Sequence, residues 1–168
     1  SLMRWTTKYA VDHPEIFNRI ANDPKVFSTE KDCIAQAFVQ ESLRLNQIER
    51  LLRHVTKSFI FEGFLFPKGS LARLCIWESH KSSDIFPDPF TFNPQRFLDH
   101  HFSLDEYAPF GIGSHRCPSG ALSIQICRLY LHSLASHYKL EGVNNGPPFR
   151  GIAHYEPAKN FTVLLHPK

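Results

Sequence analysis

The sequence has no long apolar run, and no segment approaches the roughly 20 apolar residues that a helix needs to cross a bilayer. It also lacks a basic cluster, because its 19 Lys and Arg are scattered and the net charge is only +3. No nucleic-acid partner is therefore expected. Internal repeats, low-complexity tracts and the pattern of a signal peptide are missing from the printed sequence as well. These absences leave a globular chain in which no membrane anchor is visible.

Cysteine is scarce, with four in 168 residues. No two of the four are separated by two residues, so the paired spacing of a zinc ribbon is missing. A disulfide framework is not indicated in a chain of this length, which favours a reducing compartment, the cytoplasm or the cytoplasmic face of a membrane. Cys33 and Cys75 stand among apolar residues and are expected to be buried thiols.

What the sequence has in abundance is phenylalanine and proline, with 15 and 12 residues. This composition predicts an aromatic core joined by long loops. The hydrophobic periodicity predicts a mainly helical fold with small β-sheets, forming a single domain over residues 1–168. Helices are expected over three segments: residues 1–21 with an interruption at Pro14, residues 28–46 with hydroxyl and acidic caps at 28–32, and residues 120–137. In the last helix one apolar side is formed by Leu122, Ile126, Leu129 and Leu134.

The middle and the end of the chain have the composition of short strands and loops. β-prone runs predict strands between residues 53 and 66 and again over residues 71–77. Closely spaced prolines predict an ordered loop or a few turns over residues 82–97, with further loop up to residue 117. The segment 149–166 predicts a small terminal hairpin.

The most informative segment is a glycine-rich loop that leads into a helix, with one cysteine at the junction, over residues 110–120. Gly111 and Gly113 permit positive φ, or let a planar group approach the backbone closely. Cys117 would meet the positive end of the helix dipole and free backbone N–H groups, which stabilise a thiolate. Such a sulfur suits nucleophilic chemistry or the ligation of a metal.

Two other interpretations of this segment are weaker. A buried structural cysteine would be the better interpretation of an isolated Cys. Here it would also have to account for an aromatic residue, two glycines, the cationic pair His115–Arg116 and a helix start, all in register. A phosphate-binding loop would end in Lys-Ser or Lys-Thr, and that ending is missing.

The spacing Phe-x-x-Gly-x-His/Arg-x-Cys resembles the cysteine-ligand loop of the cytochrome P-450 family, with Phe110, Gly113, His115 and Cys117 in the matching positions. The resemblance implies that Cys117 is the axial thiolate ligand of the iron of haem b. It also implies that Phe110 shields the sulfur, that His115 binds a haem propionate, and that Gly111 and Gly113 shape the cofactor loop.

A second motif is the acid and arginine pair Glu41 and Arg44, which lie three residues apart on a predicted helix. On a helix they face the same side and can form a charge-assisted pair. The helix around them is apolar, so the guanidinium needs a further partner, and Arg96 lies in a segment that can supply one. These positions resemble the family's Glu-x-x-Arg helix and Pro-x-Arg-Phe element, which implies a structural network of Glu41, Arg44 and Arg96.

Other positions either match the family pattern weakly or depart from it. Arg53 precedes the first strand region, where the family often places an arginine that binds a propionate. His80 falls in a weaker match and is expected to be a structural histidine. Ser119 stands where the family usually has glycine, two residues after the cysteine, and Asn46 stands where it commonly has proline.

The resemblance extends from about Trp5 to Leu165, so the chain is expected to be the C-terminal, haem-binding portion of the cytochrome P-450 fold. The family's acid-Thr pair, which delivers protons to bound oxygen, would fall before Ser1. Thr6 and Thr7 lie on the wrong side of Trp5 to replace it.

The resemblance implies that the whole protein is a haem-thiolate monooxygenase. It would take electrons from a ferredoxin- or flavoprotein-type donor and hydroxylate a small apolar substrate with O₂. A basic face containing Arg116 and Arg128 would suit an acidic donor. Two alternatives stay open: a degenerate haem- or partner-binding protein without oxygen chemistry, and a haem-thiolate enzyme that rearranges peroxides without a reductase.

Overall fold

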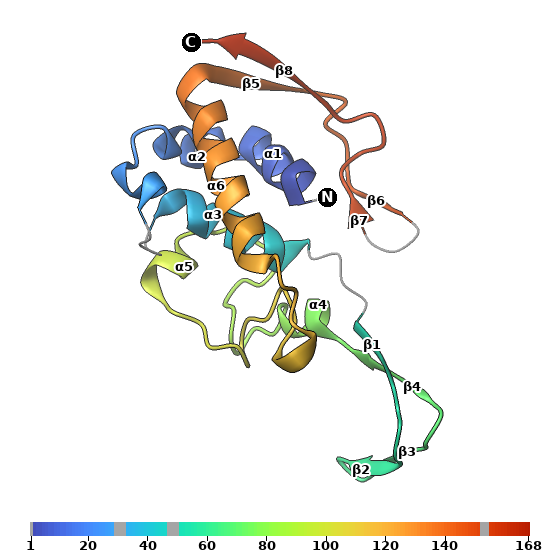
Figure 1. The fold of residues 1–168 in the computed structure, drawn as a ribbon. Helices are drawn as coiled ribbons and strands as arrows, with labels where there is room; N and C mark the ends of the chain where they lie inside the picture. Colours follow the sequence, from blue (N-terminus) through green and yellow to red (C-terminus); the bar gives the residue numbers. More distant parts are fainter. Residues whose placement is uncertain (1, 29–32, 47–50, 152–154) are drawn as a thin grey trace.

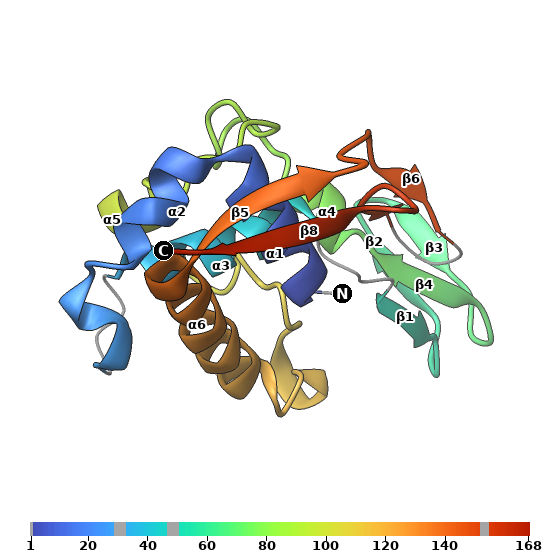
Figure 2. The ribbon, with the colours of Figure 1, turned by 90° about the horizontal axis from the view of Figure 1, so that it is seen from above.

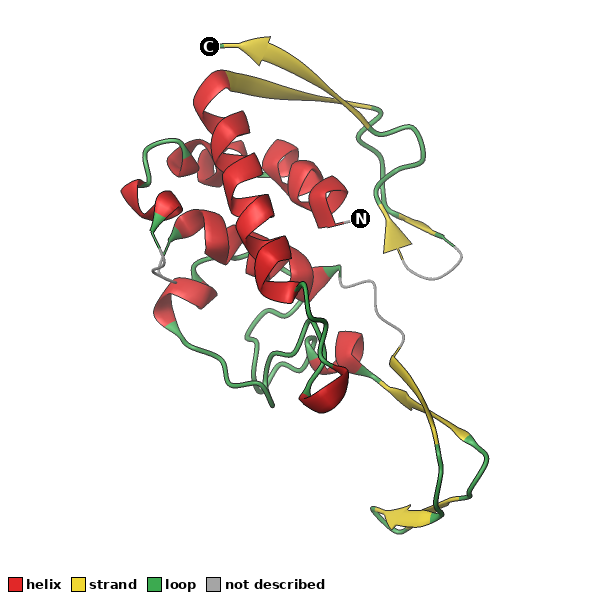
Figure 3. Cartoon of the chain, in the orientation of Figure 1, coloured by secondary structure: helices red, strands yellow, loops and turns green. Residues whose placement is uncertain are grey.

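The computed structural model describes residues 2–28, 33–46, 51–151 and 155–168 (Figure 1). The helical elements are α1 (Leu2–Asp12), α2 (Pro14–Ile20), η1 (Pro24–Phe27), α3 (Ile34–Leu45), α4 (Ile76–Ser79), α5 (Arg96–Asp99), η2 (Gly113–His115) and α6 (Gly120–His137). The strands are β1 (Leu51–His54), β2 (Phe59–Phe61), β3 (Phe64–Phe66), β4 (Leu71–Leu74), β5 (Tyr138–Val143), β6 (Phe149–Arg150), β7 (Tyr155–Glu156) and β8 (Thr162–Pro167). Each strand pairs with one antiparallel neighbour, in the pairs β1–β4, β2–β3, β5–β8 and β6–β7. The predicted class, mainly α with small β-sheets, is confirmed (Figure 3).

The ends of the first three helices follow from their local sequence. Pro14 is the first residue of α2, where its missing N–H costs no hydrogen bond, so α1 and α2 meet at His13 as predicted. At the start of α3 the cap is a thiol, because the Sγ of Cys33 accepts a hydrogen bond from the N–H of Gln36. Of the hydroxyl and acidic caps that we expected at 28–32, residues 29–32 lie outside the described residues, and Ser28 ends η1 instead of starting α3. The helix ends at Asn46, as predicted.

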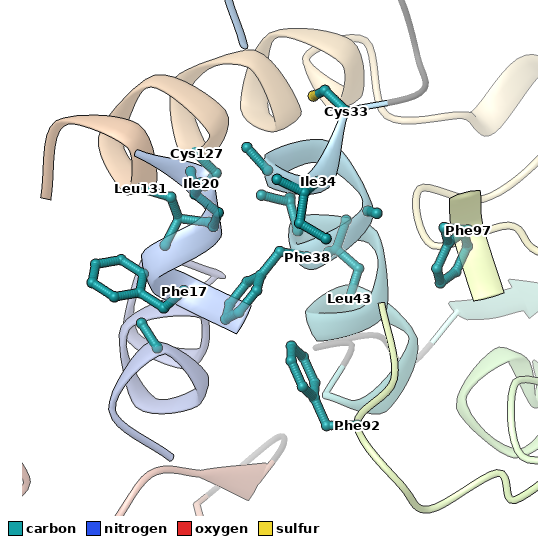
Figure 4. Packing of buried hydrophobic residues seen from close by; sticks show 14 of the residues in the cluster. Phe17, Ile20, Cys33, Ile34, Phe38, Leu43, Phe92, Phe97, Cys127 and Leu131 are labelled. Carbon is teal, nitrogen blue, oxygen red and sulfur yellow. The ribbon is translucent and has the colours of Figure 1, made fainter. Parts of the chain in front are cut away.

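The core is built around α3, which lies between α1, α2 and α6 (Figure 4). Ala37, Phe38 and Val39 of this helix are fully buried. Phe38 packs edge-on against Phe92, whose ring lies in the loop between α4 and α5. The predicted aromatic core is thus present, and it joins the helices to the proline-containing loop.

Of the two cysteines that we predicted to be buried, one is exposed. Cys33 is buried as expected, but Cys75 is exposed. The reason is that Cys75 lies at the end of β4, in the ribbon of β1 and β4 that projects away from the helices, and Leu74 beside it is exposed as well (Figure 1).

Helix α6 has apolar residues on two sides, and only one side is buried. The predicted stripe exists, but Leu122, Ile126 and Leu129 in it are exposed, at 61%, 45% and 47%. The side that packs on α2 and α3 is formed instead by Gly120, Cys127, Leu131 and Ala135. Sequence periodicity could not choose between the two sides, because both are apolar.

Two strand predictions need correction. The run over residues 71–77 is a strand only to Leu74, and the chain then turns into α4. The terminal segment does not form one hairpin with itself, because β8 pairs with β5, directly after α6, and β6 and β7 form a smaller sheet. The β5–β8 ribbon lies across α1 (Figure 2). Among the described residues no helix is both long and apolar enough to span a membrane.

The first helix, α1, is hydrogen-bonded to the strand β7, which lies near the other end of the sequence. The Arg4 guanidinium donates to a carboxylate oxygen of Glu156 at 2.7 Å, and the indole N–H of Trp5 donates to the carbonyl of Tyr155 at 3.2 Å. Trp5 is almost completely buried. Strands at the end of the sequence therefore complete the surroundings of the first helix.

Candidate functional site

The loop over residues 110–120 folds back on itself. Gly111 and Gly113 have φ of +74° and +64°, a conformation that other residues adopt only with strain, so the predicted positive φ is confirmed. The backbone N–H of Cys117 donates to the carbonyl of Phe110 at 2.9 Å. The N–H of Arg116 donates to the carbonyl of Gly113 at 3.1 Å. These two bonds fix Cys117 beside the start of the loop.

The loop is also held against the helix that follows it. A Cβ added to Gly120 would lie 2.8 Å from Cγ of Phe110, so the ring of Phe110 packs directly on the first residue of α6. No side chain fits at Gly120 unless this ring moves. The close approach falls at Gly120 rather than at Ser119, which explains how the chain accommodates Ser119 where the family usually has glycine.

The side chain of Cys117 is exposed and lies outside the buried core cluster. Its Sγ atom is 3.4 Å from the Oγ of Ser119, within hydrogen-bonding distance for sulfur. Among the described residues none of the four cysteines forms a disulfide. An exposed sulfur on a fixed loop is in a position to meet a ligand.

Two basic side chains, His115 and Arg53, lie on neighbouring parts of the molecule, the loop and β1. His115 is exposed on the loop itself. Arg53 is half-buried on β1, opposite Ala72, and donates to the carbonyl of Leu52 at 2.9 Å. A Cβ added to Gly111 would lie 3.8 Å from Cδ1 of Leu51, so β1 runs beside the loop. Within the described ranges neither His115 nor Arg53 pairs with a carboxylate.

The structure brings the residues of the second motif together in the interior. Arg44 and Glu41 are fully buried and form a bidentate pair, with Nε to Oε2 at 2.7 Å and Nη2 to Oε1 at 2.8 Å. The remaining N–H groups of Arg44 donate to three carbonyls, those of His80, Pro89 and Thr91. All five guanidinium donors therefore have acceptors.

The same carboxylate accepts two further hydrogen bonds. The Nε of Arg96 reaches Oε1 of Glu41 at 3.2 Å, and the backbone N–H of Asn93 reaches it at 2.9 Å. Arg96 also donates to the carbonyl of Pro87 at 3.1 Å. The network thus ties α3 to the proline-containing loop and to α5.

His80 connects this network to the cysteine loop. Its carbonyl accepts from Arg44, and its ring Nε2 accepts the backbone N–H of Ala108 at 3.1 Å. The carbonyl of Ala108 in turn accepts from the N–H of Gly111. Burial, with the nearby charges of Lys81 and Arg44, lowers the pKa of His80 to about 3. The ring is therefore neutral at physiological pH, and its Nε2 can accept a hydrogen bond. We expected a structural histidine at position 80, and these contacts agree with that role.

Arg128 lies in the interior of the protein and not on its surface. We expected it on a basic face, but it is fully buried, with its guanidinium bound to Gln36 and to the carbonyls of Lys25, Val26 and Ser28. Its place in the middle of the apolar helix α6 was the signal for burial that the prediction missed.

One departure noted in the sequence also acquires a contact. Asn46, at the position where the family commonly has proline, donates from its side-chain amide to the hydroxyl of Tyr9 on α1. Proline could not make this bond. The hydroxyls of Thr6 and Thr7 both donate to the carbonyl of Met3 within α1.

Taken together, the loop offers a soft sulfur ligand, while His115 and Arg53 offer hydrogen-bond donors without acidic partners in the described part of the chain. A Cβ on Gly113 would have no neighbour within 4 Å, so there is open space beside the loop. This arrangement can receive a flat ligand that carries a thiophilic metal and negatively charged edges.

Comparisons with known proteins agree on one family. The profile described as cytochrome P450 (P-450) matches residues 14–161. The chain is 30% identical to beta-amyrin 11-oxidase of Glycyrrhiza uralensis over 86% of this chain and 32% of that protein. It is 27% identical to ent-kaurenoic acid oxidase of Oryza sativa subsp. japonica, over 96% of this chain and 35% of that protein. It is 28% identical to abscisic acid 8'-hydroxylase 2 of Arabidopsis thaliana, over 90% of this chain and 36% of that protein.

A solved structure shows the same fold. Cyanobacterial CYP120A1 with bound retinoic acid superposes with a TM-score of 0.78 at 22% identity, over 99% of this chain and 42% of that one. The chain spans about a third of the length of the curated relatives named above.

Proposed function

Because this chain belongs to the cytochrome P-450 family, we propose that it forms the haem-binding part of a haem-thiolate monooxygenase, with Cys117 as the axial ligand of the iron. The observation that supports this assignment best is the exposed Cys117 sulfur on a loop fixed by two positive-φ glycines. Relatives that match most of the chain are named as oxidases and hydroxylases, which supports an oxidation of an organic substrate.

The residues present fit haem b. Its iron takes a thiolate ligand, and Cys117 supplies the sulfur. Its two propionates need hydrogen-bond donors, and His115 on the loop and Arg53 beside it have no carboxylate partners among the described residues. The open side of Gly113, where an added Cβ would have no neighbour within 4 Å, leaves room beside the backbone for a planar group.

The protein's own residues would hold the loop ready for the cofactor. Gly111 keeps the positive φ that lets the loop turn back and brings the carbonyl of Phe110 to the N–H of Cys117. The ring of Phe110, packed on Gly120, would shield the sulfur from water. When bound, the haem would supply the activation of O₂, which electron donation from the thiolate favours.

Glu41, Arg44 and Arg96 would act as a structural network behind the cofactor rather than as catalytic groups. The charges of Glu41 and Arg44 are fully buried, Arg96 is half-buried, and all three bind one another or backbone groups. Through His80 and Ala108 the network reaches the N–H of Gly111, so it would fix the position of the cysteine loop.

The substrate that we propose is a small apolar molecule, and the electron donor is of the ferredoxin or flavoprotein type. Arg116 is exposed next to Cys117 and would attract an acidic donor. Arg128 has no part in this surface, because it is buried. We place the protein in the cytoplasm or on the cytoplasmic face of a membrane, since its four cysteines do not suggest a disulfide framework.

The ligand assignment is tested by the absorption of the haem-loaded protein, reduced under carbon monoxide. We expect the long-wavelength band typical of a thiolate-ligated haem, and we expect Cys117→Ala to abolish it. Cys75→Ala is the matched control, because Cys75 is also exposed but lies after β4, outside the loop. An unchanged spectrum in Cys117→Ala, or loss of the band in Cys75→Ala alone, would show that the ligand is a different residue.

A further inference from the structure

We propose that Ser119 donates a hydrogen bond from its hydroxyl to the sulfur of Cys117, and thereby reduces the electron density that this sulfur gives to the haem iron. The inference rests on the proposed function, because it assumes that Cys117 is the iron ligand. Ser119 would act through Cys117, as a positioning residue that tunes the ligand. A glycine at this position has no side chain and could not make the bond.

The geometry directs the Ser119 hydroxyl to the sulfur. The Oγ of Ser119 lies 3.4 Å from the Sγ of Cys117. Ser119 is the N-cap residue of α6, where a serine hydroxyl ordinarily accepts a hydrogen bond from the first turn of the helix. Here the side chain makes no cap hydrogen bond, whereas Asp23 at the start of η1 accepts from the N–H of Lys25. The hydroxyl of Ser119 therefore lies near the sulfur of Cys117 and does not cap α6.

The chemistry of the two groups decides which atom donates. A sulfur that ligates iron is a thiolate, which has no proton and can only accept. The hydroxyl of Ser119 has one proton, and within the described part of the chain its side chain has no other partner than Cys117. Hydrogen bonds to a charged acceptor are stronger than those between neutral groups, so the bond is favoured once the thiolate forms.

The backbone accommodates the serine without disturbing the loop. The ring of Phe110 occupies the space beside Gly120, not beside Ser119, and Ser119 is exposed. The carbonyl of Ser119 accepts the first helical hydrogen bonds, from the N–H of Ser123 at 2.8 Å and from its hydroxyl at 2.9 Å. The backbone carbonyl of Ser119 thus accepts hydrogen bonds from α6, while its hydroxyl can donate to the sulfur of Cys117.

A donor at the sulfur has a defined effect on the haem. It draws negative charge off the thiolate, which weakens the iron–sulfur bond and favours the reduced state of the iron, because that state carries more electron density. The hydroxyl would therefore raise the reduction potential relative to a family member with glycine at this position.

The test compares variants of the haem-loaded protein by two measurements that do not depend on turnover: the iron–sulfur stretching frequency by resonance Raman spectroscopy, and the reduction potential. We expect Ser119→Ala and Ser119→Gly to shift the frequency upward and the potential to a more negative value. Ser119→Thr keeps a hydroxyl and should stay close to the wild type. Ser123→Ala is the control, because its hydroxyl binds the carbonyl of Ser119 and not the sulfur.

The outcomes separate this inference from the proposed function. If the wild-type protein shows no thiolate-ligated haem, both are wrong. If it shows one, but Ser119→Ala and Ser119→Gly match the wild type in frequency and potential, the hydrogen bond is wrong and the ligand assignment stands. A shift of the same size in Ser123→Ala, or in Ser119→Thr, would also overturn the inference, because the effect would then not come from the Ser119 hydroxyl.

Discussion

Arg44 uses all five of its N–H groups inside the protein, two on Glu41 and three on carbonyls of the loop between α4 and α5. A buried ion pair adds little stability by itself, because desolvation offsets the attraction between the charges. Its removal is different, since the partner charge and the carbonyls would then be left buried without hydrogen bonds. Arg44 therefore matters mainly because it holds the loop between α4 and α5 in position, and less because of its ion pair with Glu41.

We predict that Arg44→Ala lowers the free energy of unfolding by about 3–5 kcal/mol, and that the variant fails to incorporate haem. Chemical denaturation and haem titration measure the two effects. Arg73→Ala is the control, because Arg73 forms an exposed pair with Glu78 at 2.6 Å and its loss should cost less than about 1 kcal/mol. A stable, haem-loaded Arg44→Ala protein would refute the role of the network.

His80 gives the stability of the protein a dependence on pH. Its pKa is lowered from an ordinary value of 6.5 to about 3 in the folded protein. Between these values the unfolded chain binds a proton on this ring that the folded protein does not, so the free energy of unfolding falls as the pH is lowered, by at most about 1.4 kcal/mol per pH unit. Above pH 6.5 the contribution does not change.

We predict that His80→Gln, which keeps an acceptor for the N–H of Ala108, flattens the loss of stability between pH 6 and pH 4 relative to the wild type. The measurement is the free energy of unfolding at several pH values. His54→Gln, at an exposed position on β1, should retain the slope of the wild type. Equal slopes in wild type and His80→Gln would show that His80 is not the source of the acid sensitivity.

At the scale of the element, α6 has apolar residues on two sides that differ in exposure to solvent. Leu131 on one side is fully buried against the core, while Leu129 on the other side is 47% exposed. Both are leucines of the same helix, two residues apart. Their difference lies only in what the rest of the chain places against them.

We predict that Leu131→Ala lowers the free energy of unfolding by about 2–5 kcal/mol, because it leaves a cavity in the core. Leu129→Ala should change it by less than about 1 kcal/mol, since this side chain is 47% exposed and its removal leaves no enclosed cavity. Denaturant unfolding of the two variants measures both values. Equal losses would mean that the exposed side of α6 is packed in solution.

Local sequence predicted those elements whose signals are local. The start of α2 at Pro14, the end of α3 at Asn46 and the span of α6 all follow from helix-terminus and periodicity rules. The strand β5 was missed, because Tyr138–Val143 directly continues a long helix and gains its structure only by pairing with β8. Pairing between distant segments has no signal in either segment alone.

At the scale of the whole molecule, the site depends on contacts between residues far apart in the sequence. The cysteine loop could be predicted, because its glycines, cations and sulfur lie within 11 consecutive residues, 110–120. The meeting of Glu41 with Arg96 could be predicted only through the resemblance to a family. The link from His80 to Ala108 was not predicted, because it has no pattern in the sequence. The burial of Arg128 was missed, although its place in the middle of an apolar helix indicated it.

The meeting of the first helix with the last strands bears on the order in which the chain can fold during synthesis. The ribosome makes α1 before β7, so the indole N–H of Trp5 finds its acceptor on Tyr155, and Arg4 finds Glu156, only after some 150 more residues have been added. Until then the apolar ring of Trp5 lacks these native neighbours and is exposed to wrong contacts. Premature termination anywhere before β7 would therefore leave α1, and not just the residues next to the stop, without its contacts to Tyr155 and Glu156.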